Sequence, residues 1–124
     1  MQGLHLTGDL FEFGCNAATL TALEALSSLC RKATLDANLT IVDETWHVFP
    51  DWNGQPGGIT GTILLAESHF AIHTWPERRG VTLDVYVCNF TEDNTGKAEQ
   101  LSDTLLVAFR PQSQVVNRIT RGDV

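Results

Sequence analysis

The sequence predicts an α+β fold: a two-layer α/β sandwich with an antiparallel sheet and two helices packed on one face. The hydrophobic periodicity changes along the chain in the order strand, helix, several strands, helix, strand. The predicted middle strands follow one another through short connections, whereas parallel neighbours would need long crossovers. With 124 residues the chain has the length of a single domain, 1–124. Helices on one face leave the other sheet face bare and apolar, so we also expect dimerisation.

The first half of the chain predicts a strand, a helix, a second strand and a loop. Residues 3–13 (GLHLTGDLFEF) form the first strand, and residues 39–49, rich in β-branched and aromatic side chains, form the second. Asn16 is a suitable helix cap, and we expect one helix from there to about Ala37. Residues 50–58 (PDWNGQPGG) are dense in turn formers and predict a loop. The apolar stripe of the helix is predicted to contain Leu20, Leu23, Leu26, Cys30 and Ala33.

The second half predicts three strands, a helix and a last strand. The helix spans residues 94–109, with Leu101, Leu105 and Phe109 on one side, and Pro111 stops it. A short strand follows at 113–120. The three strands before the helix are predicted at 59–66, 70–75 and 81–88.

Composition and charge exclude several classes of protein. The net charge is −7 and the eight lysines and arginines are scattered, which argues against a nucleic-acid binder. No apolar run approaches the ~20 residues that span a bilayer, and the N-terminus has no signal-peptide pattern, so no membrane association is expected. The chain has three cysteines, an odd number, and they show no CxxC spacing. This predicts reduced thiols in a cytoplasmic protein.

One polar segment, residues 66–77 (AESHFAIHTWPE), lies where the pattern otherwise predicts core strands. A hydrolase triad could be drawn from Ser68, His73 and Asp84, but no GxSxG elbow frames the serine. A Cys88–His73 nucleophile pair has no local signature either. The alternative of ordinary core or edge histidines explains poorly why so many reactive side chains share one segment.

A metal site is also weakly supported by the histidines. His69 and His73 are four residues apart, and in a strand this spacing separates them by roughly 13 Å, too far to bind one ion. His5 and His47 would complete a cluster only if the fold happened to bring them there. We therefore expect no metal.

Residues 66–77 and the later DVYVC segment resemble the small bacterial and archaeal form of S-adenosylmethionine decarboxylase, a pyruvoyl-dependent enzyme of spermidine synthesis. The shared pattern is ESH, three residues, HTWPE, and then an acidic, hydrophobic strand that ends in cysteine. The segments GLHLTGDLFEFGC, WHVFP and GITG extend the resemblance, which covers most of residues 3–90. The remaining helix and strand match the family in kind only.

The resemblance implies a proenzyme that cleaves itself between Glu67 and Ser68. The Ser68 hydroxyl attacks the Glu67 carbonyl, the peptide becomes an ester, and β-elimination gives a β chain, 1–67, and an α chain, 68–124. Ser68 then becomes a covalent pyruvoyl group, the cofactor that forms a Schiff base with the substrate amine. The chain has only two lysines, neither in a site-like context, and no glycine-rich phosphate loop, so pyridoxal phosphate is not expected.

The resemblance also implies roles for further residues. His73 is the proton acceptor in processing, Cys88 the proton donor in catalysis, and Thr60 stands where the family has a serine that assists processing. Strict strand alternation would put Ser68 and His73 on opposite faces, so we expect a bend or bulge near residues 67–70.

Substrate binding follows from the same resemblance. Phe49 and Trp75 are expected to stack on the adenine of S-adenosylmethionine, and Glu77 is expected to accept hydrogen bonds from the ribose. The implied assembly is a homodimer of processed αβ protomers, with the pocket at or near the interface and no metal.

Four departures from the family pattern weaken the inference that the substrate is S-adenosylmethionine. Asn89 replaces a glycine, and Thr60 replaces the serine. The loop at 50–58 is longer than usual and carries an extra Trp52, and Phe13 and Gly14 lengthen the approach to Cys15. Two other functions therefore stay open: a pyruvoyl-dependent arginine or ornithine decarboxylase, and a non-catalytic relative that binds a nucleoside.

Overall fold

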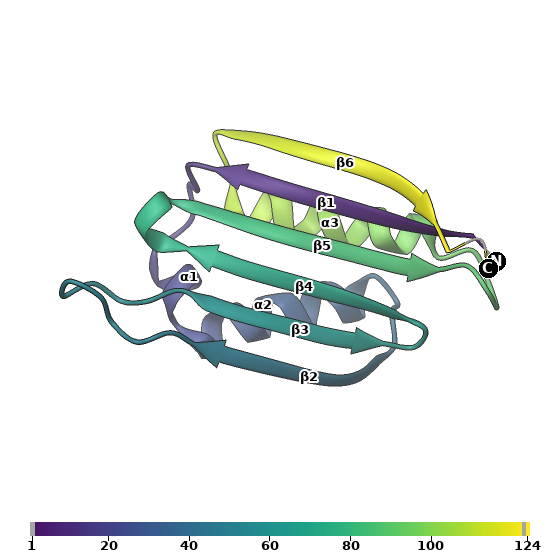
Figure 1. Ribbon diagram of the computed structural model, residues 1–124, viewed down its shortest axis with the longest axis horizontal. Coiled ribbons are helices and arrows are strands. Elements are labelled where there is room, and N and C mark those ends of the chain that lie inside the picture. Colours follow the sequence, from purple (N-terminus) through teal and green to yellow (C-terminus); the bar gives the residue numbers. More distant parts are fainter. Residues whose placement is uncertain (1, 123) are drawn as a thin grey trace.

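The computed structural model describes residues 2–122 and 124, and its main feature is one six-stranded sheet. The strand order is β2-β3-β4-β5-β1-β6 and every neighbouring pair is antiparallel (Figure 1). The first and last strands of the chain, β1 and β6, lie side by side at one end of the sheet. The strands are β1 (Gly3–Phe11), β2 (Ile41–Val48), β3 (Ile59–Leu65), β4 (Ser68–Trp75), β5 (Gly80–Cys88) and β6 (Ser113–Arg121).

The helices all lie behind the sheet in the view of Figure 1. They are α1 (Ala18–Thr21), α2 (Leu23–Asp36) and α3 (Thr95–Phe109), and a 3-10 turn, η1 (Pro76–Arg78), joins β4 to β5. Helix α2 packs on β2 and β3, whereas α3 packs on β1 and β5. The predicted two-layer sandwich with an antiparallel sheet is therefore confirmed. In the described part of the chain, no helix is both long and apolar enough to cross a bilayer.

The core lies between the helices and the sheet face that they cover. Helix α2 contributes Leu26 and Cys30, and α3 contributes Leu101, Leu105 and Phe109, all of them fully buried. These residues follow the predicted helical spacing. Burial raises the pKa of the Cys30 thiol to about 12, so this cysteine is a neutral core side chain.

The prediction of a single helix from Asn16 to Ala37 is wrong, because the helix is interrupted at Ala22. Ala22 is extended, with φ −98° and ψ 114°, and it separates α1 from α2. The Leu20 carbonyl accepts a hydrogen bond of 2.7 Å from the buried Thr74 hydroxyl on β4. A long-range contact thus binds the carbonyl of one helical turn to the sheet. The N-cap of α1 is Ala17 and not the predicted Asn16, although the Asn16 Oδ1 does accept a hydrogen bond from the Ala18 N–H at 3.0 Å.

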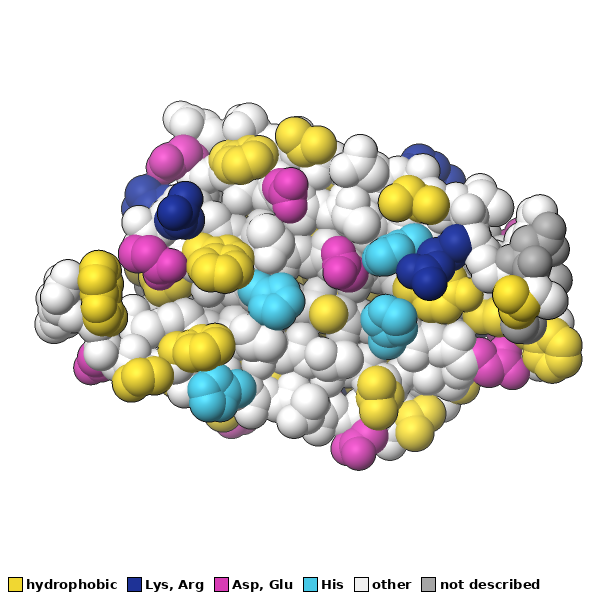
Figure 2. Space-filling model, in the orientation of Figure 1, with side chains coloured by type: hydrophobic (Ala, Val, Ile, Leu, Met, Phe, Trp, Pro, Cys, Tyr) yellow, Lys and Arg dark blue, Asp and Glu magenta, His cyan; other side chains and the backbone are white. Residues whose placement is uncertain are grey.

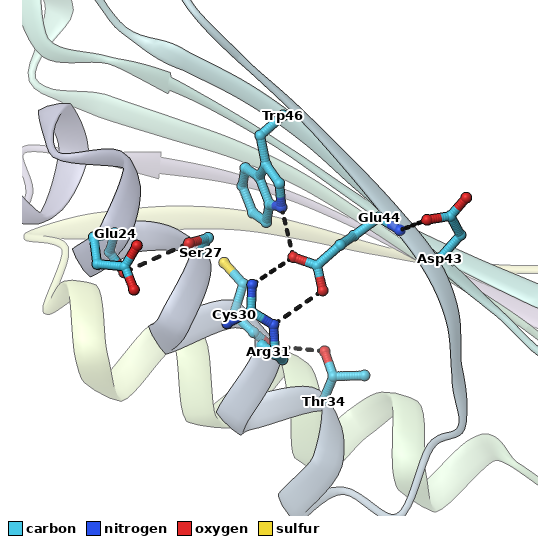
Figure 3. A network of polar contacts seen from close by, with 8 residues as sticks. All are labelled: Glu24, Ser27, Cys30, Arg31, Thr34, Asp43, Glu44 and Trp46. Carbon is cyan, nitrogen blue, oxygen red and sulfur yellow. Dashed lines mark hydrogen bonds and ion pairs between the residues drawn. The ribbon is translucent and has the colours of Figure 1, made fainter.

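Helix α2 is fastened to the edge strand β2 by a polar network (Figure 3). Both guanidinium arms of Arg31 donate to the Glu44 carboxylate, at 3.0 and 2.6 Å. The Trp46 indole N–H donates to the same carboxylate at 2.9 Å. The Arg31 hydrogen bond lowers the pKa of Glu44, against the opposing effect of burial. This network holds the Trp46 ring over Gly61 of β3, where an added Cβ would collide with the ring.

We expect Gly61→Ala to lower the free energy of unfolding by about 1–3 kcal/mol, because the new methyl group must displace the Trp46 ring. Urea denaturation measures the loss. The matched control is Gly96→Ala in α3, where an added Cβ meets nothing within 4 Å and alanine favours the helix. An equal loss in both variants would contradict the packing argument.

No helix covers the second sheet face within the described residues, and we call this face the open face. Figure 2 views it directly and shows histidine and separate hydrophobic side chains spread across it. By strand alternation and register, it carries the side chains of all four histidines of the chain, several threonines, and exposed apolar groups such as Phe11 and Leu64. The face is thus mixed and less apolar than the sequence led us to expect.

Candidate active site

A tight hairpin turn presents the predicted cleavage point. Strands β3 and β4 pair without a break up to Leu65 and Ser68, which leaves only Ala66 and Glu67 in the turn. Glu67 has a φ of +64°, in the left-handed region that a side chain other than glycine rarely occupies. A positive φ at the second central residue of a turn suits glycine better than glutamate. The peptide bond before Ser68 therefore begins at a strained residue.

The Ser68 hydroxyl is held by the end of the neighbouring strand β5. Its Oγ accepts a hydrogen bond of 3.0 Å from the backbone N–H of Cys88. Ser68 is half-buried, and Cys88 is buried. The structure therefore brings the Ser68 hydroxyl to the backbone of Cys88, which is twenty residues away in the sequence.

The loop after Cys88 is fixed by two asparagines. The Asn94 side-chain amide donates to the Cys88 carbonyl at 2.8 Å, and the Asn94 backbone N–H donates to Oδ1 of Asn89, also at 2.8 Å. Asn89 also donates to the Thr95 hydroxyl at 3.2 Å. Asn89 had stood out as a departure from the family glycine, and here it fastens the loop. Asn94 was missed as a neighbour of Cys88, because its place as the first residue of the predicted helix gives no sign of this contact.

A second group of predicted residues lies at the other end of β4. Thr60 on β3 is directly opposite His73, and the Thr60 hydroxyl and the His73 Nδ1 are 2.9 Å apart. Both side chains lie on the open face. Trp75, two residues further along the same face, donates its indole N–H to the Thr82 hydroxyl on β5 at 3.2 Å. Thr82 was not singled out in the sequence, because its contact depends on the register of β4 and β5.

Thr60, His73 and Trp75 line a cleft with a volume of about 1230 Å³. Phe49, Thr60, His73, Trp75 and Glu77 all contribute to its wall, so five of the predicted site residues share one cavity. Phe49 and Trp75 are each nearly half exposed, which leaves two aromatic surfaces facing solvent.

The charged side chains of the cleft differ in how they are engaged. Arg79 is paired with Glu12 at 2.7 Å and also donates to the Phe13 carbonyl. Glu77 takes part in none of the ion pairs found among the described residues. Its carboxylate is therefore available to a ligand with hydrogen-bond donors.

The predicted bend or bulge near residues 67–70 is present only as the turn at Glu67, and it does not unite Ser68 with His73. The register of β4 with both neighbours is continuous from residue 68 or 69 onward, and the only irregularity in these strands lies in β2, near Ile41 and Asp43. The chain does bend at Glu67, but the five residue steps from Ser68 to His73 span about 16 Å of regular strand. The two side chains lie on opposite faces, as alternation requires.

Two other arrangements considered for the sequence also fail within one chain. Asp84 lies opposite Ala71 on the open face, whereas the Ser68 side chain points to the other face, so the Ser68–His73–Asp84 triad does not form. Cys88 lies at the Ser68 end of the sheet, far from His73.

Two of the remaining histidines, His5 and His69, belong to a small aromatic cluster. His5 and His69 both pack against Tyr86, with ring centroids 6.1 and 5.5 Å from its own. Desolvation, reinforced by His5, lowers the pKa of His69. The described residues contain no group of three or more histidine, cysteine or acidic side chains placed to hold a metal ion.

Comparison with known sequences finds one family. The pattern of the S-adenosylmethionine decarboxylase family matches residues 4–122. An S-adenosylmethionine decarboxylase proenzyme from Picrophilus torridus is 32% identical over 120 residues, which cover 97% of this chain and 84% of the relative. One from Archaeoglobus fulgidus is 33% identical over 120 residues and 97% of both chains.

A solved structure agrees with the sequence comparison. The crystal structure of the adenosylmethionine decarboxylase from Aquifex aeolicus is similar, with a TM-score of 0.82 and 34% sequence identity. The match covers 98% of this chain and 92% of that one.

Proposed function

The chain belongs to the S-adenosylmethionine decarboxylase family, and we propose that it decarboxylates S-adenosylmethionine with a pyruvoyl group made from its own Ser68. The observation that carries the proposal is the position of the Ser68 hydroxyl. It lies immediately after the strained Glu67 and accepts a hydrogen bond from the Cys88 backbone. The relatives are named as proenzymes, which agrees with maturation by cleavage.

The chemistry of maturation balances with the residues present. The Ser68 Oγ attacks the Glu67 carbonyl carbon, and the acyl group moves from nitrogen to oxygen to give an ester. A base then removes the Ser68 Cα proton, and the Glu67 carboxylate leaves as the new C-terminus of residues 1–67. Water converts the resulting dehydroalanine to a pyruvoyl group on residues 68–124 and releases ammonia. Relief of the Glu67 strain favours the first step.

The surroundings of Ser68 fit a pyruvoyl group and the reaction that it supports. A pyruvoyl carbonyl supplies an electron sink for the carbanion that loss of CO2 leaves. Cys88 is buried, and its backbone N–H contacts the Ser68 hydroxyl, so we assign its thiol the return of a proton to the substrate. The Asn94 amide holds the Cys88 carbonyl and so fixes the backbone that carries the thiol.

A complete site needs a second copy of the chain, because His73 is too far from its own Ser68. A two-fold axis between two open faces, perpendicular to β4 and near Ala71, would put the Ser68 end of one copy opposite the His73 end of the other. The Ser68 side chain leans toward the helices, so its Cα–H bond leans toward the open face. His73 of the second copy would then approach the proton that must be removed, with Thr60 orienting its ring. This geometry supports the expected homodimer.

The cleft suits the two parts of S-adenosylmethionine. Phe49 and Trp75 offer partly exposed aromatic faces to the adenine and to the sulfonium charge. Glu77 can accept hydrogen bonds from the ribose hydroxyls. In the two-fold arrangement, the cleft of one copy also faces the Ser68 of the other, which places the binding and reacting groups in one site.

The wider role follows from the product. Decarboxylated S-adenosylmethionine is an aminopropyl donor, so we place the protein in spermidine synthesis. The three cysteines are free, which supports a reducing compartment such as the cytoplasm.

We expect the purified protein to consist of two fragments, one ending at Glu67 and the other beginning with a pyruvoyl group at position 68. Mass spectrometry identifies both fragments, and borohydride reduction labels the second one.

The same preparation should release CO2 from S-adenosylmethionine at least about 100-fold faster than from ornithine or arginine, because neither has a purine to stack. Preference for ornithine or arginine would instead assign the amino-acid decarboxylase. An intact chain that binds adenosine without turnover would assign the non-catalytic relative.

A further inference from the structure

The segment between β2 and β3, residues 50–58, projects from one end of the sheet (Figure 1), and the turn at its tip lines the cleft. Trp52 and Gln55 exchange two backbone hydrogen bonds, of 2.9 and 3.0 Å. Asn53 and Gly54 between them have φ angles of +52° and +73°. Positive φ at both central residues, with an Asn-Gly pair, is the signature of a type I′ turn. The tip of this segment therefore has a definite conformation.

The base of the same segment is closely packed. The Phe49 N–H donates to the Gly58 carbonyl at 3.0 Å, which closes the loop at its neck. A Cβ on Gly57 would collide with the Phe49 carbonyl, and one on Gly58 would collide with the Thr74 carbonyl. Both glycines allow the backbone to pass close to neighbouring strands. The neck of the segment is thus fixed, and Trp52 lies at the wall of the cleft.

Trp52 itself has no packing role that accounts for its position. Its side chain is 69% exposed, more than that of Phe49 or Trp75, yet it lines the same cleft as both. A solvent-exposed tryptophan in the wall of a cavity is typical of a residue that contacts a ligand. The wall of the cleft therefore includes three exposed aromatic side chains, Phe49, Trp52 and Trp75, besides the buried Phe13, and two suffice to enclose one adenine.

We infer that Trp52 is a further specificity-determining residue, which contacts the purine nucleoside end of the substrate and selects it over a simple amino acid. This inference rests on the proposed function of the cleft and extends it to the long loop. The indole provides a broad, rigid aromatic face at low entropic cost and the strongest cation–π partner among side chains. The other occupant of such a surface is a second copy of the chain, which the test must separate from the ligand.

We expect Trp52→Ala to cleave normally and to raise the KM for S-adenosylmethionine roughly 5- to 10-fold, while kcat changes less than about 2-fold. Trp52→Phe should recover most of the affinity. Isothermal titration with 5′-deoxy-5′-methylthioadenosine, which cannot be decarboxylated, should show the same loss. Val107→Ala, an equally exposed apolar position on α3 outside the cleft, is the control and should change neither quantity.

Two readouts separate this inference from the proposed function. If wild-type protein does not decarboxylate S-adenosylmethionine but binds methylthioadenosine in a manner that needs Trp52, the proposed function fails and the inference stands. If wild-type protein decarboxylates but Trp52→Ala leaves KM and binding unchanged, the inference alone is overturned. It is also overturned if wild-type protein binds no nucleoside, or if sedimentation shows that the KM rise merely follows dissociation of the dimer.

Discussion

Ser68→Ala will leave the chain in one piece and abolish decarboxylation. Alanine keeps the Cβ but has no hydroxyl to attack the Glu67 carbonyl, so neither the ester nor the pyruvoyl group can form. Without that electron sink, turnover should fall by a factor on the order of 10⁴ or more. Denaturing electrophoresis gives the chain length, and release of labelled CO2 from carboxyl-labelled S-adenosylmethionine gives the rate.

Cys88→Ala is the matched control, because it keeps the backbone N–H that binds the Ser68 hydroxyl. The chain should therefore still cleave, whereas turnover should drop by about 10²–10⁴-fold for want of a proton donor. A Ser68→Ala chain that cleaves, or that is active while intact, would refute the pyruvoyl mechanism. An uncut Cys88→Ala chain would instead refute the division of roles between the two residues.

The fold could be predicted where the sequence pattern is local. Alternation in the strands, and the spacing of Leu101, Leu105 and Phe109 in α3, depend on neighbours in the chain and gave the right layers. The break at Ala22 could not be foreseen, since alanine is the best helix former. Its cause is the hydrogen bond from Thr74 to the Leu20 carbonyl, which joins residues 54 positions apart. Such a contact leaves no mark in the local sequence.

The candidate site, like the fold, could be predicted only where it depends on the local sequence pattern. Thr60, His73 and Trp75 lie on one face because strand register and alternation put them there, and the sequence pattern contains both. The bulge expected near Ser68 came from the assumption that one chain holds the whole site. Strand alternation alone predicts that Ser68 and His73 lie on opposite faces, and the unbroken register of β4 confirms it. The sequence pattern of one chain gives no information on where a second copy of the chain lies.

Two inactive variants should restore each other if the site is shared between copies. Neither Ser68→Ala nor His73→Ala should cleave alone, since one lacks the nucleophile and the other the base. In a mixed dimer, one shared site combines the intact Ser68 of the His73→Ala chain with the intact His73 of the Ser68→Ala chain. Random pairing puts about half of the His73→Ala chains in mixed dimers, so about half should be cleaved. Coexpression with two different tags, followed by electrophoresis, measures that fraction.

The identity of the cleaved chain makes this experiment decisive. Only the His73→Ala chain carries a serine at position 68, so a cut Ser68→Ala chain would show that the label or the cleavage is spurious. Coexpression of His73→Ala with a His73→Ala, Ser68→Ala double variant is the control, because no mixed dimer then contains His73. If only this control and the single variants stay intact, His73 acts on the neighbouring copy across the open face. If the complementing pair also stays intact while mixed dimers are recovered through both tags, each chain would have to bring its own His73 to Ser68. The 16 Å of regular strand between them would then have to rearrange before cleavage.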